Sequence, residues 1–259
     1  MANSHHVSLV KNPTLWNDWR WRNPDVIPDL RGADLSGCDL RGINLADADL
    51  YGANLSGCNL AEADLTKANC YQVNFQRADL SDANCYKGCF NFANFQEANL
   101  TETDFSVACL ENANLCNANL KDCYLIRASL KNANLSHTYS RGVTLTEANL
   151  SGVNFAYADL RDADLSNTIV INADFTGACL TGAYLEGWCF DDSTQIGQVI
   201  CEYYYWLNRQ KKEVFSKSTL VDLSQELSRL GQTTRDIPIP VYSDFQSSYK
   251  NVYPLSSSP

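Results

Sequence analysis

One nine-residue pattern occurs twice near the start of this chain, as Gly32-Ala-Asp-Leu-Ser-Gly-Cys-Asp-Leu40 and as Gly52-Ala-Asn-Leu-Ser-Gly-Cys-Asn-Leu60. In both copies an apolar residue returns every five positions. The same spacing continues from Leu30 to Phe190, which gives 33 pentad centres, and 29 of these are Leu or Phe. The other four centres are Cys70, Cys85, Ser140 and Val170. The pattern never slips in phase, so it sets the fold of most of the chain.

A period of five suits neither a helix nor a flat strand. At about 100° per residue, successive centres would lie roughly 140° apart around a helix, and an odd spacing would alternate them between the two faces of a strand. The chain must therefore turn a corner in each pentad. A small residue, usually Ala, lies two positions before each centre, so both point inward if the backbone between them is extended. Asp or Asn directly precedes 23 of the 33 centres, as expected for outer surfaces and corners.

Four pentads should close one coil, because the two quoted copies lie 20 residues apart. Asn74-Phe-Gln and Asn94-Phe-Gln repeat this spacing. These residues resemble the A(D/N)LxX units of the pentapeptide-repeat family, including its cyanobacterial members. The resemblance implies an all-β solenoid, a right-handed quadrilateral parallel β-helix of about eight coils with short α-helical caps at both ends. At ~4.8 Å per coil the tube would be roughly 38 Å long.

We expect five regions along the chain. They are a mobile N-terminus (1–11), an N-terminal helical cap (12–27), the β-helix (28–192), a C-terminal cap with a strand-like segment and a helix (193–231), and a tail rich in Pro, Ser and Tyr (232–259). The pair His5-His6 is too short and too terminal to indicate a metal site.

The N-terminal cap is predicted from Asn12 and Pro13, which suit the N-cap and the first turn of a helix. Three tryptophans, Trp16, Trp19 and Trp21, follow within this helix. They could form a ligand-binding aromatic box, but the first coil of a solenoid has an open apolar end that a terminal element must cover. The sequence therefore favours a capping role for all three.

The C-terminal region is predicted to combine a strand-like segment at 199–207 with a helix from Ser218 or Thr219 to about Leu230. Leu220, Leu223, Leu227 and Leu230 would share one stripe of that helix. The helix either caps the tube or mediates dimerisation, so we expect a monomer or a dimer through the C-terminal end. The tail beyond residue 232 is either loosely draped or disordered.

Composition bounds the environment of the protein. No window reaches the ~18 apolar residues of a membrane span, and the first residues lack the basic start and apolar run of a secretory signal. A cytoplasmic protein without membrane contacts is expected. Ten of the eleven cysteines occupy repeat positions, several of them inward ones such as Cys58 and Cys123, so we expect reduced thiols that pack as small hydrophobes.

Apolar residues at positions expected to face water mark a possible interaction patch. They gather on the side containing Leu45 and around the following corner, and they are Tyr86, Cys89, Phe92, Val107, Cys109, Tyr124 and Ile126. Exposed apolar clusters often mark interfaces, but the C-terminal segment could equally cover this one. Both interpretations stay open.

Acidic residues form a possible column on the side containing Leu40, and they are Glu62, Asp82, Glu102, Asp122 and Asp162. Lys121, Arg141 and Arg161 accompany its later half, and the remaining negative charge is divided among all four sides. Because the formal net charge is −10, we expect no binding to nucleic acid.

Thr138 and Ser140 form an irregular corner, because two hydroxyls stand where Ala and Leu are expected. The neighbouring His137 suggests a nucleophile, but an inward Ser and an outward His do not converge. A bulge, a buried water or a tolerated defect remain, and we favour the defect because the phase resumes at Leu145 without an insertion.

The sequence contains no phosphate-binding loop, zinc-ligand cluster or nucleophile elbow, so we expect no enzyme, no catalytic residue, no cofactor and no metal. The leading hypothesis is a binding or scaffolding rod whose partner is another, unidentified protein. The resemblance implies two alternatives: a DNA mimic that binds a type II topoisomerase such as gyrase, and a regulator of cell differentiation in a cyanobacterium. Negative charge shared among four sides weakens the case for mimicry.

Overall fold

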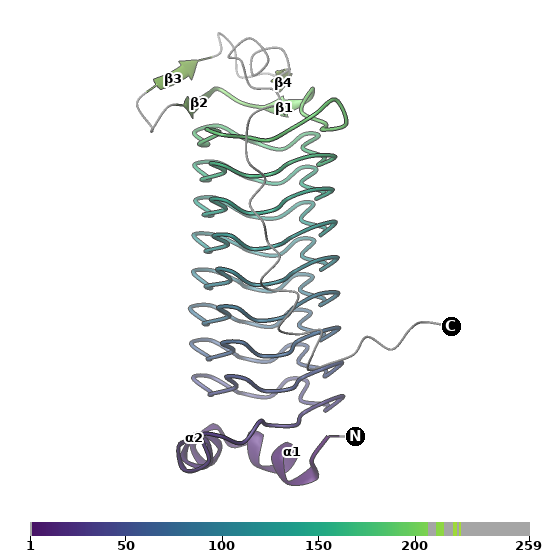
Figure 1. The fold of residues 1–259 in the computed structure, drawn as a ribbon, viewed down its shortest axis with the longest axis vertical. Coiled ribbons are helices and arrows are strands. Elements are labelled where there is room, and N and C mark those ends of the chain that lie inside the picture. Colours follow the sequence, from purple (N-terminus) through teal and green to yellow (C-terminus); the bar gives the residue numbers. More distant parts are fainter. Residues whose placement is uncertain (1, 207–210, 215–219, 222, 224–259) are drawn as a thin grey trace, which may run out of the picture.

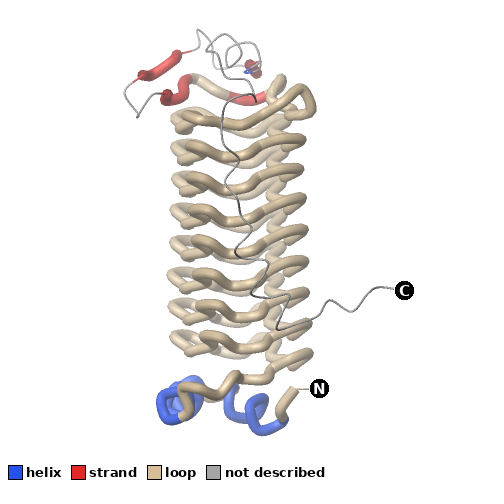
Figure 2. Tube along the Cα trace, viewed as in Figure 1, coloured by secondary structure: helices blue, strands red, loops and turns tan. Residues whose placement is uncertain are grey.

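The computed structural model describes residues 2–206, 211–214, 220–221 and 223, and it shows a stack of coils with two helices at its N-terminal end (Figure 1). Residues 20 positions apart pair in parallel on every side of the stack, from Asp29 with Asp49 to Ile169 with Cys189. Four pentads therefore make one coil, as predicted. Figure 2 shows the helices at one end and the short strands at the other, with the tube between them.

Most pentads make the same set of backbone hydrogen bonds. At Leu50, the centre donates its N–H to the Asn69 carbonyl of the next coil at 2.8 Å, and Asn69 donates to Ala48 at 2.8 Å. Gly52 donates to Tyr71 at 2.9 Å, and Ala53 closes the corner by donating back to Leu50 at 2.8 Å. The backbone N–H and C=O groups along a side are thus hydrogen-bonded to the neighbouring coils. The sides therefore present side chains and not a free strand edge.

Every corner from residue 32 to residue 187 has one residue with positive φ, and it is always the second residue after the centre. Ten of these residues are Gly and 22 are not. Because the residue before it is never among those with positive φ, the corners are type II turns. Asn, Asp and Gly suit this position. Val107, at φ 63°, is β-branched and so the least suited.

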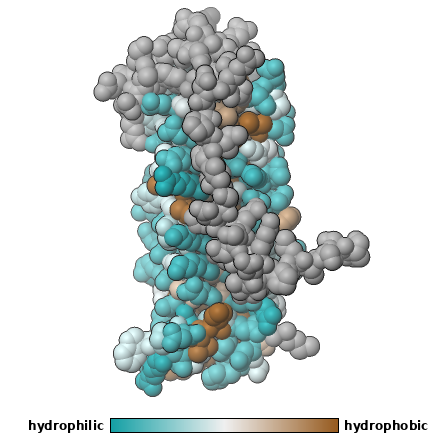
Figure 3. All heavy atoms as spheres, viewed as in Figure 1, coloured by the Kyte–Doolittle hydropathy of each residue, from teal (hydrophilic) through white to brown (hydrophobic). Residues whose placement is uncertain are grey.

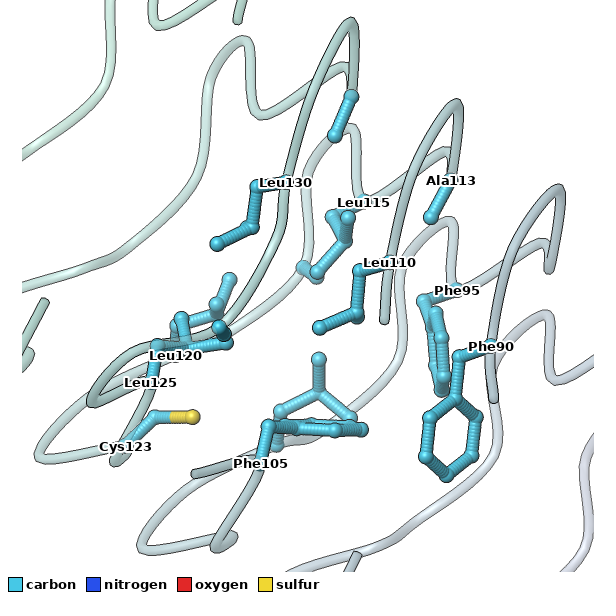
Figure 4. Close-up of a cluster of buried hydrophobic side chains, with 14 of the residues drawn as sticks. Phe90, Phe95, Phe105, Leu110, Ala113, Leu115, Leu120, Cys123, Leu125 and Leu130 are labelled. Atoms are coloured by element: carbon cyan, nitrogen blue, oxygen red, sulfur yellow. The ribbon is translucent and has the colours of Figure 1, made fainter. Parts of the chain in front are cut away.

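The interior is a column of stacked rings and aliphatic side chains. Phe75 and Phe95 lie parallel in successive coils with ring centroids 4.8 Å apart, and Phe90 meets Phe105 edge to face at 5.2 Å. Figure 4 shows Phe90, Phe95 and Phe105 close together in the interior, with leucines such as Leu115 beside them. Offset and edge-to-face aromatic pairs add to the area that they bury, so the predicted core is confirmed.

The N-terminal cap contains two helices, α1 (Ser4–Val10) and α2 (Pro13–Arg22). Trp16 is fully buried and donates its Nε1–H to the Asn44 carbonyl at 2.6 Å, and Arg20 donates to the Ala46 carbonyl at 2.9 Å. These carbonyls belong to the first coil, which has no coil below it. The cap therefore hydrogen-bonds the open edge as well as covering the core.

Two expectations about this end need correction. The segment 1–11, for which a mobile end was expected, contains α1, because Asn3 caps the helix and the buried His6 accepts a hydrogen bond from the Asp29 N–H at 3.0 Å. Trp19 packs partly against the core, but Trp21 is 81% exposed, since it lies on the outer face of α2. Capping is therefore carried by Trp16 and Trp19, not by Trp21.

The coil continues beyond residue 192, where the β-helix was expected to end. One residue is inserted after Phe190, so Asp174 pairs with Gln195 and Tyr184 pairs with Tyr205, 21 positions apart. Ile196 and Cys201 then take the inward positions and are buried. The solenoid therefore extends by most of one further coil in a shifted phase.

Short antiparallel strands close the C-terminal end. β1 (Val199–Ile200) pairs with β4 (Leu220–Val221), and β2 (Tyr203–Trp206) pairs with β3 (Lys211–Val214). Residues 220–221, expected in a helix, are instead a strand, because their backbone pairs with β1. Leu223 is buried, but the rest of that predicted helix, including Leu227 and Leu230, and the tail 232–259 lie outside the described residues.

Candidate interaction surface

Two sides of the tube carry a run of nine outward positions without charge. One run, on the side of Leu35, extends from Asn114 to Tyr157, and the other lies on the side of Leu50. This second run, here called the uncharged strip, extends over three coils and consists of Tyr51, Gly52, Asn69, Tyr71, Gln72, Cys89, Asn91, Phe92 and Cys109. Charged residues bound it, with Asp49 before it and Glu111 after it. On a chain with net charge −10, such a strip stands out as a place where another polypeptide can dock without desolvating ions.

An aromatic ladder runs along one edge of the uncharged strip. The rings of Tyr51 and Tyr71 stack at 5.6 Å with an interplanar angle of 2°, and Tyr71 meets Phe92 of the next coil at 5.3 Å. Tyr51 and Phe92 are each 48% exposed. Burial, with smaller contributions from Tyr51 and Cys89, raises the pKa of Tyr71. The ladder thus presents three preordered rings, two of them half open to solvent.

The outward strand positions of this side are also the least exposed of the tube. On the other three sides the residue before each centre is half-buried or exposed in every coil. On this side six such residues are buried, and they are Asp49, Asn69, Cys89, Asn149, Ile169 and Cys189. The side therefore combines low charge with low exposure at its middle and aromatic rings at its edge.

The structure divides the predicted patch into three parts. Cys89, Phe92 and Cys109 lie on the uncharged strip. Cys89 is buried, and its backbone pairs in parallel with that of Cys109 in the next coil. Tyr86, Val107 and Ile126 are half-buried at the preceding corner, and Val107 donates its N–H to the Ile126 carbonyl at 2.8 Å. Tyr124 is exposed on the adjoining side.

Tyr51 and Tyr71 are the members of this surface that the sequence analysis missed. Each occupies an ordinary corner position of its own pentad, so neither departs from the repeat. The available signal was their separation of 20 residues, which places them in one column of the coil.

The predicted acidic column exists but is partly paired. Its five members all occupy positive-φ corner positions. Arg41 forms a salt bridge with Glu62, Lys121 lies 3.6 Å from Asp122, and Arg141 lies 3.1 Å from Asp162. Cations therefore accompany both ends of the column, which reduces its resemblance to a track of phosphates.

The irregular corner forms a closed pair of hydroxyls. Ser140 Oγ donates to Thr138 Oγ1 at 2.9 Å, and Thr138 Oγ1 donates to the Leu135 carbonyl at 2.8 Å. Both side chains are buried, whereas His137 is exposed and stacks on Tyr157 at 5.2 Å. Ser140 and Asp159 still pair in the regular ladder, so the corner has no bulge. The arrangement does not bring Ser and His together for nucleophilic chemistry.

The cysteines are unpaired and mostly buried. All eleven lie within the part of the chain that the structure describes, and all are free thiols. Burial raises the pKa of Cys58 to about 11 and that of Cys109 to about 12, and it raises those of Cys70 and Cys85 well above the usual value. Such thiols are poor nucleophiles at neutral pH.

Three other features bear on metal, membrane and small-molecule binding. Among the described residues, no group of three or more His, Cys, Asp or Glu side chains could hold a metal ion. No described helix has the length and hydrophobicity needed to cross a bilayer. A cavity of about 500 Å³ lies where the phase shifts, lined by residues such as Asp191, Thr194 and Gln198. Figure 3 shows that hydrophilic side chains dominate the described surface in that view, with hydrophobic ones in a few separate spots.

Comparisons with known proteins agree with the repeat. A family model described as pentapeptide repeats matches the chain in 8 copies, which together cover residues 29–187. No curated protein matches the chain significantly.

Among solved structures, HetL, a pentapeptide-repeat protein involved in heterocyst differentiation regulation from the cyanobacterium Nostoc sp. strain PCC 7120, is 24% identical. The match covers 70% of this chain and 94% of HetL, with a TM-score of 0.36. QnrB1, a plasmid-mediated fluoroquinolone resistance protein, is 22% identical over 60% of this chain and 81% of its own, with a TM-score of 0.41. Rfr23 from the cyanobacterium Cyanothece 51142 is 27% identical over 47% of this chain and 63% of its own, with a TM-score of 0.18.

Proposed function

The chain belongs to the pentapeptide-repeat family, and on that premise we propose that it is a non-enzymatic scaffold that binds another protein through the uncharged strip. The observation that carries this proposal is the ladder of Tyr51, Tyr71 and Phe92 beside a strip without charge. Tyrosine and other aromatic residues dominate the binding energy of protein interfaces, and charged residues are depleted at their centres.

The rigidity of the ladder favours binding. Tyr51 stacks on Tyr71, Phe92 contacts Tyr71 at a tilt, and the backbone is held by hydrogen bonds to the coils on both sides. Little conformational entropy therefore remains to be lost on association. The sides of the tube offer no unpaired strand edge among these coils, so a partner must recognise side chains. An extended or helical segment of a protein with apolar side chains fits this requirement.

A cytoplasmic location is part of the proposal. Eleven free thiols suit a reducing compartment, in which disulfides rarely persist. We further propose that the protein is either a monomer or a dimer through its C-terminal end. Size-exclusion chromatography with light scattering distinguishes the two.

The alternatives gain less support from the residues of this chain. Mimicry of DNA toward a type II topoisomerase needs a dense acidic track, and the acidic column is accompanied by Arg41, Lys121 and Arg141. Regulation of cell differentiation is compatible with a protein-binding scaffold, and no described residue favours it specifically.

Affinity capture from a lysate of the source organism tests the proposal. A Tyr71→Ser/Phe92→Asn variant removes two rungs of the ladder, and we expect at least a tenfold loss of specifically captured protein. Tyr157→Asn is the matched control, because Tyr157 is also a stacked and exposed corner aromatic but lies on another side. Equal capture by all three proteins would contradict the proposal.

A further inference from the structure

We propose that residues 237–253 of this chain dock on the uncharged strip in cis and compete there with the partner protein. The inference concerns regulation of the surface assigned above to partner binding, and to that extent it rests on the proposed function. It follows from the position where the described chain ends, from the composition of the segment beyond it, and from the chemistry of the strip.

The chain leaves the described structure at the C-terminal end of the tube. Leu223 is buried there and donates its N–H to the Ile196 carbonyl at 3.3 Å. The coil of Ile196 lies five coils from that of Phe92, which is ~24 Å at the spacing of stacked strands. The 13 residues from 224 to 236 can span up to ~43 Å, so Ile237 can reach the strip without strain.

The composition of residues 237–253 matches the strip. The segment has only two charged residues, Asp244 and Lys250, so its net charge is zero. Ile237, Ile239 and Val241 alternate with Pro238 and Pro240, and proline favours extended backbone in the residue before it. In an extended chain these three apolar side chains share one face. Further along, Phe245, Tyr249 and Tyr253 can stack on the ladder.

The prolines of this segment are compatible with docking through side chains. The N–H and C=O groups of the strip are already bonded between coils, so docking cannot proceed by adding a strand to a sheet edge. A proline-containing segment lacks some of the N–H groups that strand addition requires. Contact through side chains suits both surfaces.

Two properties select this side of the tube over the others. Its outward strand residues are buried in six coils, and two of them, Asn69 and Cys89, belong to the uncharged strip. It is also the side on which an uncharged run over three coils carries three aromatic rings in contact, those of Tyr51, Tyr71 and Phe92, whereas the acidic column lies on the side of Leu40. Docking on the uncharged strip removes no charged side chain of the tube from water, so it carries a low desolvation cost for a neutral segment.

Photo-crosslinking of the full purified chain tests the inference. Phe92→p-benzoylphenylalanine places the probe in the ladder, and Tyr157→p-benzoylphenylalanine is the control on another side. Light and heavy isotope-labelled chains are mixed, so that adducts within one molecule are told apart from adducts between two. We expect intramolecular adducts from position 92 to peptides within 237–253, at least ten times more abundant than those from position 157. Adducts to a second copy, equal adducts from both positions, or none to 237–253 would overturn the inference.

A second experiment perturbs the segment itself. In the full chain, Ile237→Ser/Ile239→Ser/Val241→Ser should accelerate alkylation of Cys109 several-fold and increase capture of partner protein from a lysate. Substitution of Ser256, Ser257 and Ser258 by Ala is the control and should change neither. An unchanged alkylation rate in the triple variant would contradict cis docking. Because the crosslinking and alkylation assays contain no partner, their failure is distinguishable from failure of the proposed function.

Discussion

Replacing Ser140 by Leu should stabilise the tube. Ser140 is 1% exposed and is the only hydroxyl among the 33 centres, in a column where Leu120 and Leu160 occupy the neighbouring coils. Burying Leu contributes ~1.5–3 kcal/mol, whereas losing the hydrogen bond to Thr138 costs about 0.5–1.5 kcal/mol. Thr138 keeps its hydrogen bond to the Leu135 carbonyl, so no buried donor is left unpaired.

The expected net gain of about 1 kcal/mol corresponds to a rise of roughly 2–4 °C in Tm for a chain of this size. Thr138 is larger than the usual Ala, so the single variant can lose part of this gain to overpacking. The variant Thr138→Ala/Ser140→Leu restores the common pentad and removes that cost. Leu160→Ser, in the same column, is the control and should lower Tm by several degrees.

Circular-dichroism melts at matched concentration measure the effect. If both Ser140→Leu and Thr138→Ala/Ser140→Leu melt below wild type, the reasoning is refuted, and the hydroxyl pair is required by the coil and not a tolerated defect.

Four further predictions follow from the corners, the cap, the thiols and the surface charge. Val107→Asn should raise Tm, because replacing a β-branched residue at positive φ removes about 1 kcal/mol of backbone strain. Asn112→Val should lower Tm by a similar amount, and opposite shifts would contradict the type II corners. Burial lowers the pKa of His6 below its usual 6.5. The stability that its neutral ring gives the cap is therefore present above pH ~6.5 and lost as pH falls through the lowered pKa. Fluorescence of Trp16 and Trp19 against pH should show a transition that His6→Gln lacks, and an unchanged transition in the variant would exclude His6 as its cause. Freshly prepared protein should show eleven reactive thiols after denaturation but few before it, and a clear deficit after denaturation would reveal disulfides. Titration with duplex and single-stranded DNA at low salt should show no saturable binding, and inhibition of gyrase in a supercoiling assay, if any, should be weak; salt-sensitive binding or potent inhibition would overturn the charge argument.

The coil was predictable from sequence because packing repeats it. Each pentad must place a small residue and a larger apolar residue inside, two positions apart, and this demand fixes both the phase and the 20-residue coil. Cys70 and Cys85 are buried in the positions of Leu for the same reason.

The ends were less predictable because they follow no repeat. The inserted residue after Phe190 changes the phase, and Thr194 and Ile196 do not look like a pentad even though both are buried. The role of His6 depends on a contact with Asp29 that is 23 residues away, which no local pattern indicates.

The candidate surface was found only in part. Cys89, Phe92 and Cys109 were recognised because they break the repeat, whereas Tyr51 and Tyr71 obey it. Their importance arises from the column that they share, which is visible only when the coil is used to order the sequence.

Hydroxyl-radical footprinting tests most directly whether this side is the contact surface. The Ile237→Ser/Ile239→Ser/Val241→Ser chain, in which the competing segment is released from the strip, is oxidised in buffer and in a lysate of the source organism. Side-chain oxidation is quantified by mass spectrometry at Tyr51, Tyr71 and Phe92 and, on other sides, at Tyr139 and Tyr157. The account predicts that the lysate protects the three ladder residues at least several-fold while Tyr139 and Tyr157 stay unchanged. Protection of Tyr139 and Tyr157 with an unprotected ladder would contradict it.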